Sequence, residues 1–508
     1  MRNSRVRRFG ALLVGLAFVA ASCGSDDAEP AATQGSTAAP ASTAAAAETT
    51  EAAADTTEAA AETTEAAADT TEAAADTTEA AADTTEAASD TTEAESDTTA
   101  VAGGDDSALS GMKGTTPLVE LSDDFKDRLN ATDAAAATPL DETYNYAAET
   151  YDAIVLVALA AEQAGTDGSA LADEIVELTK DGEKCTDFAS CMEIVTAGGD
   201  VDYDGFSGPI TMNGNGEPLE ASYGVLTFGE GNVIDDSITT YVTASAPESA
   251  ELPLATAEVE REGDGVLKIG SILPETGSLA FLAPPEFAAA ELAIEDINDA
   301  GGVLGEPVEF FPGDSGDTST DTASQTVDRL LGEDVDAIIG AASSSVSLTV
   351  IDKITAAGVI QFSPANTSLT LVDYPDKGLY FRNAPPDDLQ GNVVAQLVAD
   401  DGNSSAYILA LDDAYGTSLA TVVEEALTAA GVEVLGTKIY DPKATGFDAE
   451  VDEIVAADAD AVVLITFDEG SRILKTMVEK GVGPQDKAVY GVDGNMGNAL
   501  GENFNAGK

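Results

Sequence analysis

Residues 266–273 read VLKIGSIL, and this stretch, followed by the loop PETGSLAFLAPP at 274–285, decides the fold. Its apolar and partly β-branched composition predicts a short buried strand. Residues 286–300 then show the apolar periodicity of an amphipathic helix, which ends at Gly301 and Gly302. Strand, loop and helix in this order form the repeating unit of a parallel sheet.

The same alternation continues to the end of the chain. Further strand candidates are VEFFP, DAIIGAAS, GVIQFSP, SAYILALDD, VEVLGTKIY, DAVVLITF and KAVYGVDG, and helical segments are expected at 321–331, 347–357, 389–400, 417–430 and 470–480. This pattern predicts an α/β fold with parallel sheets covered by helices on both faces. Ligands on such sheets bind in the loops beyond the carboxyl ends of the strands.

Residues 107–245 form a block of different character. We expect a strand at 112–118, helices at 122–130, 142–164 and 169–178, and two strands around SYGVLTF and SITTYVT joined by GEGN. The helices have apolar faces, but the block has too few core strands to cover them. We therefore expect it to dock against residues 265–508, to which a linker at 246–264 joins it, so that 107–508 form one two-lobed unit.

The first 23 residues are predicted to be an export signal. MRNSRVRR is basic, and the apolar stretch after it is too short to span a bilayer comfortably. The signal ends in Ala-Ala-Ser before Cys23, which resembles a bacterial lipobox whose cysteine receives lipid. The alternative is a plain signal peptide with an incidental cysteine. Either version places the protein outside the cytoplasmic membrane, and the lipobox adds a lipid anchor.

Residues 24–106 contain no Lys or Arg and repeat TTEAAAD-like units with a period of seven. A coiled coil would have only Ala to bury in its seam, while paired Thr and unopposed acidic charge disfavour a helix. A disordered spacer is the better interpretation, with an r.m.s. span of roughly 50 Å. Whether the Thr residues carry glycans is left open.

Composition limits the function. The chain has 22 basic and 93 acidic residues and a formal charge of −71, so nucleic acid is a poor partner. It contains no His, which excludes an imidazole base and a His-ligated metal. We therefore predict neither catalysis nor a cofactor nor a metal. Cys185 and Cys191 are expected to form a local disulfide, because a metal site would need more ligands.

Several stretches together resemble the amino-acid-binding lipoproteins of ABC importers, the branched-chain amino-acid type with the type I periplasmic-binding-protein fold. They are IGSILPETGSLAFLAPPE, GDTSTDTASQTVDRLLGEDVDAIIGAASSSVS, IQFSPANTS, DDAYGTSLA, MKGTTP and KCTDFASC followed by DYDGFSGPITMNGNGEP. The resemblance covers nearly all of 107–508. It implies two Rossmann-like lobes with a ligand cleft between them.

The order of the two blocks differs from the family's. There, the part resembling 265–508 comes first and the part resembling 107–245 follows it. The simplest explanation is a circular permutation with new ends opened at a surface position. A fusion of one fragment to a truncated copy is the alternative, and in that case the chain could dimerise or be non-functional.

The resemblance also implies a ligand site. Ser344 and Thr367, with the main chain near Ala365, would bind a ligand carboxylate, and Ser343 lies in the same strand-end loop. Helix capping is the competing interpretation for these hydroxyls. The remaining candidates are Asp493 for the ligand ammonium, Tyr415 as a cover from the other lobe, and Phe281 and Phe467 as walls, although either Phe could simply be core. Family members often have Tyr near position 467, so Phe there leaves the ligand's identity open.

The expected mechanism is closure of the lobes around a small amino-acid-like ligand, followed by delivery to an ABC permease in the membrane. Other amino acids, amides, urea and short peptides stay open as ligands. Two other roles stay open as well: a sensor component with the same fold, and a surface protein that binds no ligand.

Overall fold

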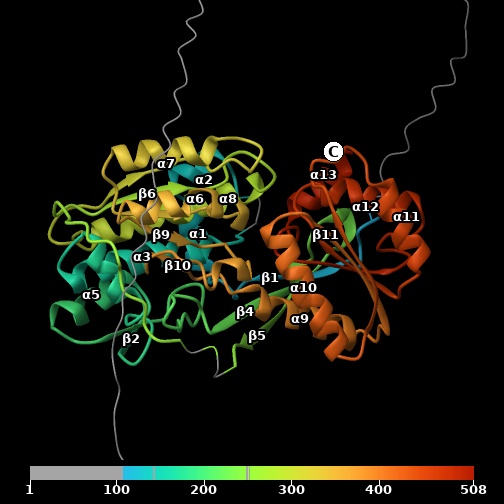
Figure 1. Ribbon diagram of the computed structural model, residues 1–508, viewed down its shortest axis with the longest axis horizontal. Coiled ribbons are helices and arrows are strands. Elements are labelled where there is room, and N and C mark those ends of the chain that lie inside the picture. Colours follow the sequence, from blue (N-terminus) through green and yellow to red (C-terminus); the bar gives the residue numbers. More distant parts are fainter. Residues whose placement is uncertain (1–106, 141–143, 248–249, 251, 508) are drawn as a thin grey trace, which may run out of the picture. The chain divides into compact units, whose positions relative to one another are not determined.

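The fold is built on two separate β-sheets (Figure 1). It is described by a computed structural model, which covers residues 107–140, 144–247, 250 and 252–507. The predicted export signal, Cys23 and the repeat spacer lie outside the described residues. We call the part built on the five-stranded sheet lobe 1 and the part built on the seven-stranded sheet lobe 2.

Lobe 1 has a wholly parallel sheet in the order β10-β9-β8-β6-β7. Helices α3 and α6 pack on one face of this sheet, and α7 and α8 pack on the other. Residues 147–161 of α3 are all buried, so this part of the helix has no solvent-exposed face. The strands are β6 (Lys268–Ile272), β7 (Glu309–Phe311), β8 (Ala337–Gly340), β9 (Ile360–Ser363) and β10 (Tyr380–Arg382).

The helices of lobe 1 come from both blocks of the sequence. From the first block come α1 (Asp123–Asn130), α2 (Asp133–Ala137), α3 (Ala147–Ala164), α4 (Ala172–Ile175) and α5 (Phe188–Thr196), with the small sheet of β2 (Glu183–Cys185) and β3 (Val201–Tyr203). From the second block come α6 (Ala283–Asp299), α7 (Thr322–Gly332) and α8 (Ser344–Ala356).

Lobe 2 has a mixed sheet in the order β12-β11-β13-β14-β1-β4-β5. Its strands are β11 (Ser405–Leu411), β12 (Glu433–Tyr440), β13 (Ala461–Ile465), β14 (Ala488–Gly491), β1 (Lys113–Pro117), β4 (Glu220–Thr227) and β5 (Thr240–Ser245). Its helices are α9 (Asp387–Asp400), α10 (Ala414–Ala429), α11 (Asp448–Ala457), α12 (Gly470–Glu479) and α13 (Asn498–Ala506).

Strand β1 completes the parallel part of the lobe 2 sheet. It pairs parallel with β14, where Lys113 lies opposite Tyr490, and antiparallel with β4 on its other side. The parallel strands of each lobe can be numbered 1 to 5 in chain order, with β1 counted after β14 in lobe 2. Both sheets then have the spatial order 2-1-3-4-5. In this topology ligands bind where the strand order reverses, at the carboxyl ends of the strands.

The linker between the two blocks packs on lobe 1. The N–H of Ala255 donates to the carbonyl of Gly214 over 2.7 Å, and that of Glu258 donates to the carbonyl of Lys377 over 2.9 Å. Arg261 of the same linker forms an ion pair with the buried Asp336. The described residues belong to one compact unit. The α/β fold class is confirmed, because each large sheet has five parallel strands, to which β4 and β5 add antiparallel strands in lobe 2.

Some local predictions were wrong. The expected helix at 169–178 is a short 3-10 turn followed by α4, which ends at Ile175. Helix α5 was not expected; it begins after Asp187, whose side chain accepts from the N–H of Ser190. The short strand β10 was also missed. The expected disulfide between Cys185 and Cys191 is present and joins β2 to α5.

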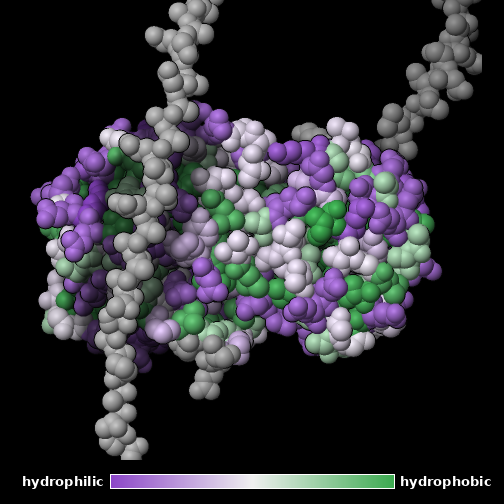
Figure 2. Space-filling view, in the orientation of Figure 1, coloured by the Kyte–Doolittle hydropathy of each residue, from purple (hydrophilic) through white to green (hydrophobic). Residues whose placement is uncertain are grey.

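The visible face of the folded part is mostly hydrophilic or intermediate in hydropathy, with apolar residues in smaller patches (Figure 2). None of the described helices is both long enough and apolar enough to cross a membrane.

Candidate functional site

The site is centred on Asp493, which lies just beyond Val492, after the end of β14 in lobe 2. The residue is 4% exposed. The hydroxyl of Tyr415 donates to Oδ1 over 2.7 Å, and the hydroxyl of Tyr146 donates to Oδ2 over 2.8 Å. Tyr415 lies at the start of α10 and Tyr146 directly before α3, so each oxygen of one carboxylate is held by a different part of the chain.

Burial raises the pKa of Asp493, and the hydrogen bonds from Tyr415 and Tyr146 act in the opposite direction. No ion pair found among the described residues involves Asp493. A buried carboxylate without a cation is costly, and a ligand cation beside it would lower that cost. The next residue must be small, because a Cβ on Gly494 would lie 3.0 Å from both Phe467 and the Tyr415 hydroxyl.

The opposite wall of the cavity is the N-terminus of α8 in lobe 1. Ser343 caps this helix, with its hydroxyl accepting from the N–H of Val346, so the capping interpretation is correct for that residue. Ser344 is 2% exposed, and its hydroxyl accepts from the N–H of Ser368 over 3.3 Å. Both residues line the same small cavity as Ala365 and Asp493. A helix N-terminus is a natural site for a carboxylate.

Thr367 does not line this cavity, although the loop that carries it does. Its carbonyl accepts from the N–H of Asp387 over 2.8 Å, next to the point where the chain passes from lobe 1 to lobe 2. Burial raises the pKa of Asp387 to about 7, and the nearby Ser418 and Thr367 hydroxyls lower it.

The remaining walls are apolar. The rings of Tyr415 and Phe467 stack with centroids 5.4 Å apart, and Leu279 and Leu282 close the cavity from lobe 1. Phe281 lies outside this cavity and lines a neighbouring one with Phe467. The cavity measures about 20 Å³ in this conformation, less than an amino acid occupies, so a ligand of that size requires the lobes to separate.

The two lobes contact each other directly beside this cavity. The hydroxyl of Ser345 in lobe 1 donates to Asp413 over 3.1 Å, and the N–H of Ala414 donates to the same hydroxyl over 2.9 Å. The hydroxyl of Ser368 donates to the carbonyl of Ala414 over 2.7 Å. These bonds join the start of α10 to the start of α8 and to the loop after β9 in lobe 1, as expected for a closed cleft.

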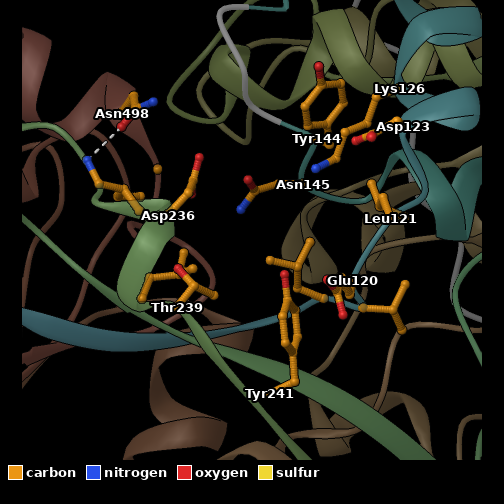
Figure 3. A pocket seen from close by; sticks show the side chains of 15 residues that line it. Glu120, Leu121, Asp123, Lys126, Tyr144, Asn145, Asp236, Thr239, Tyr241 and Asn498 are labelled. Carbon is orange, nitrogen blue, oxygen red and sulfur yellow. Dashed lines mark hydrogen bonds between the residues drawn. The ribbon is translucent and has the colours of Figure 1, made fainter.

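A larger cavity of about 490 Å³ lies beside the crossing from β1 to α1, and Asp493 does not line it. Figure 3 shows Tyr144, Asn145 and Lys126 on one side of it and Asp236, Thr239 and Asn498 on another. It contains none of the predicted ligand residues. In the part of the chain that the structure describes, no group of His, Cys, Asp or Glu side chains is arranged to hold a metal ion.

Sequence reasoning did not predict Tyr146, Leu279 or Leu282 as residues of the site. Tyr146 has a left-handed backbone conformation with φ of 60° and precedes a helix without a side-chain cap, so no helix-start signal marks it. Leu279 and Leu282 belong to the loop after β6, which was expected to contribute Phe281 instead.

Comparison with known proteins agrees with this geometry. Residues 266–507 match a family model described as periplasmic binding protein. Residues 266–507 therefore have the sequence pattern of a periplasmic binding protein. Residues 65–230 match a second model, described as receptor family ligand binding region.

Two curated relatives are similar to parts of this chain. A Leu/Ile/Val-binding protein homolog from Brucella suis is 26% identical over 274 residues, 52% of this chain and 64% of the relative. The chemotactic signal transduction system substrate-binding protein BasB from Halobacterium salinarum is 30% identical over 205 residues, 39% of this chain and 49% of the relative. The chain thus spans between about half and just under two thirds of their lengths.

Among solved structures, the branched-chain amino acid transporter substrate binding protein LivJ from Streptococcus pneumoniae, in complex with isoleucine, is 26% identical. The match covers 47% of this chain and 67% of that one, with a TM-score of 0.42.

Proposed function

We propose that this protein binds an α-amino acid between its two lobes, outside the cytoplasmic membrane, and delivers it to an ABC permease. The observation that carries the proposal is Asp493, a buried carboxylate held by two tyrosine hydroxyls and facing a cavity. The ammonium group of an amino acid would supply the missing positive charge. Its carboxylate would lie toward Ser343, Ser344 and Ala365 at the start of α8.

The walls favour an apolar side chain. Leu279, Leu282 and Phe467 offer hydrocarbon or aromatic surface and no charge. Each methylene group buried against such a wall contributes about 0.8 kcal/mol. A branched-chain amino acid therefore fits the lining, in keeping with the name of the Brucella relative.

The mechanism is closure of the two lobes. Tyr415, Phe467 and Asp493 belong to lobe 2, whereas Leu279, Ser344 and Ala365 belong to lobe 1. A ligand that contacts both groups of residues stabilises a closed form that is wide enough to hold it. The closed form is the one that a permease would recognise. No covalent bond changes in this process.

We also propose that the chain is a circular permutation and that its mature N-terminus is a lipidated Cys23. Strand β1 supports the permutation, because it lies where a strand following β14 and α13 would lie. The new N-terminal segment would then enter lobe 2, and a disordered spacer would connect that lobe to the membrane. In a fragment fusion the two blocks would not complement each other in this way.

A sensor is the second candidate. The Halobacterium relative is named as part of a chemotactic signal transduction system, so a periplasmic binding protein with this degree of similarity can serve a signalling partner. Both roles share the ligand site and differ in what binds the closed form.

Thermal unfolding of the full-length chain with and without ligand tests the proposal. Leucine, isoleucine and valine are the first probes; leucinamide lacks the carboxylate and 4-methylvalerate lacks the ammonium. A probe at a hundred times its dissociation constant should stabilise the fold by about 2.7 kcal/mol. We expect this stabilisation from leucine, isoleucine or valine, and not from leucinamide or 4-methylvalerate. A cooperative transition that none of the common amino acids shifts would contradict the proposal.

A further inference from the structure

Arg382 is the largest fully buried side chain of the described residues, with 0% exposure. It ends β10, the edge strand of lobe 1, shortly before the chain crosses to α9 in lobe 2. Burying a guanidinium is expensive unless a countercharge and hydrogen-bond acceptors surround it. The groups that bond to Arg382 therefore show which segments of the chain it holds in place.

One partner is a carboxylate from the other block of the sequence. Nη2 of Arg382 lies 2.6 Å from Oε1 of Glu217, which is itself buried. The backbone N–H of Arg382 also donates to the carbonyl of Gly216 over 3.1 Å. Gly216 must be glycine here, because its φ is +75° and a Cβ would collide with the ring of Phe381. Burial works against the charge on Arg382, but Glu217 keeps the pKa of its guanidinium above the ordinary value.

The other partners are two carbonyl groups of the loop that follows β9. Nη1 of Arg382 donates to the carbonyl of Ser368 over 3.0 Å and to that of Asn366 over 3.3 Å. These residues flank Thr367. In a planar trans peptide the N–H points away from the C=O, so fixing the Asn366 carbonyl toward Arg382 directs the N–H of Thr367 away from it.

The same loop is tied to the loop after β8. The side-chain amide of Asn366 donates to the carbonyls of Ala341 and Ala342 over 2.9 and 2.8 Å, and its Oδ1 accepts from the hydroxyl of Tyr380. The N–H of Ser368 donates to the Ser344 hydroxyl. Arg382 thus holds the backbone of one of the two loops that form the carboxylate end of the cavity, and Asn366 couples it to the other.

We propose that Arg382, oriented by Glu217, is a positioning residue that sets the loop 364–368 for recognition of the ligand carboxylate. This inference rests on the proposed function and deepens it. Arg382 does not touch the cavity. It acts through the carbonyl groups of Asn366 and Ser368, and its orientation depends on a residue of the block 107–245.

A double substitution separates this role from simple stabilisation. Arg382→Met with Glu217→Met replaces both charges by unbranched apolar side chains, a change that often leaves stability near its original value. Either substitution alone would leave one buried charge without its partner. The matched control is Arg261→Met with Asp336→Asn, which removes another ion pair of lobe 1 that does not contact residues 364–368.

Two measurements on the full-length chain are needed: amide hydrogen exchange of residues 363–369 without ligand, and leucine affinity by calorimetry. In the double Met variant we expect at least tenfold faster exchange in this segment. We also expect leucine affinity to fall about 10- to 100-fold, the loss associated with hydrogen bonds to a charged group. The control should change neither.

Unchanged exchange at 363–369 in a folded double Met variant would overturn the inference. If that variant does not fold, Arg382→Lys keeps the charge beside Glu217 but lacks the planar fork that spans two carbonyls. Wild-type exchange in the Lys variant would then overturn it as well. If the wild-type chain binds no amino acid, the proposed function fails, and the exchange measurement still decides whether Arg382 holds the loop.

Discussion

The hydroxyl of Tyr146 donates to Oδ2 of Asp493 over 2.8 Å, although 347 positions separate the two residues in the sequence. Tyr146 belongs to the first block and Asp493 to the second. The cavity is therefore complete only when both blocks fold together. The Arg382–Glu217 pair shows the same dependence on the other side of the cleft.

Asp493→Asn should weaken amino-acid binding much more than it changes the stability of the protein. The substitution keeps the shape of the side chain but removes the charge that would pair with a ligand ammonium. Removing one partner of a buried ion pair costs about 3–5 kcal/mol, so leucine affinity should fall at least about 100-fold. Calorimetry measures the affinity and a thermal melt measures the stability.

Asp458→Asn is a suitable control for this prediction, since Asp458 is an exposed acid of the same lobe and its left-handed backbone suits Asn. Leucine binding of Asp493→Asn at wild-type strength would show that Asp493 does not bind the ammonium.

Stability should fall between pH 4.5 and 8 because of a buried pair of glutamates. Burial raises the pKa of Glu149 from 4.5 to about 8, and burial together with the charge of Glu149 raises that of Glu286. In this window the folded state retains protons that the unfolded state has released. The free energy of unfolding therefore decreases with rising pH, by up to about 1.4 kcal/mol per pH unit for each group.

Glu149→Gln should flatten this profile, gaining stability relative to the wild type at pH 8 more than at pH 5. Denaturant titrations at several pH values measure the slope. Glu295→Gln, at an exposed position on α6, should leave the slope unchanged. A wild-type profile that is flat from pH 5 to 8 would contradict the prediction.

The disulfide should stabilise lobe 1 locally and leave the ligand site unaffected. It closes a short loop between β2 and α5, for which the loop-entropy estimate is about 2 kcal/mol. Cys185→Ser with Cys191→Ser should lower the free energy of unfolding by about that amount. Leucine affinity should stay the same, because neither cysteine lines the cavity. A reductant should lower the melting temperature of the wild type but not that of the variant.

The strands and the loops beyond them were predictable because their signals are local. Each buried parallel strand is an apolar run, and Ser343, Ala365, Tyr415, Phe467 and Asp493 all follow such runs and meet at one cavity. Lobe closure and the identity of neighbours across lobes are not local properties. Neither Tyr146 nor the Arg382–Glu217 pair has a signal in its own part of the sequence. Strand β10 was missed for a related reason, because it has three residues and ends in a charged one.

Restoring the usual order of the family should preserve both fold and binding. A chain with residues 265–508 first and 107–245 after them would join α13 directly to the segment before β1. The ends are suited to this: Gln485 donates to the carbonyls of Ser107 and Ser110, and Asn505 of α13 donates to the carbonyl of Gly231 in the turn beside them. β1 could then still pair with β14 in parallel, by a crossover through α13.

We expect the reordered chain to unfold cooperatively and to bind leucine with an affinity close to the original, because it keeps every residue that lines the cavity. A matched control carries the same reordering with Tyr146→Phe, which removes the bond to Asp493 and should weaken binding in both orders alike. If the two blocks were fused fragments of separate molecules, joining them in the reverse order would not restore a two-lobed unit. The reordered chain would then aggregate or lose the cavity, whereas retained binding and a single transition would establish the permutation.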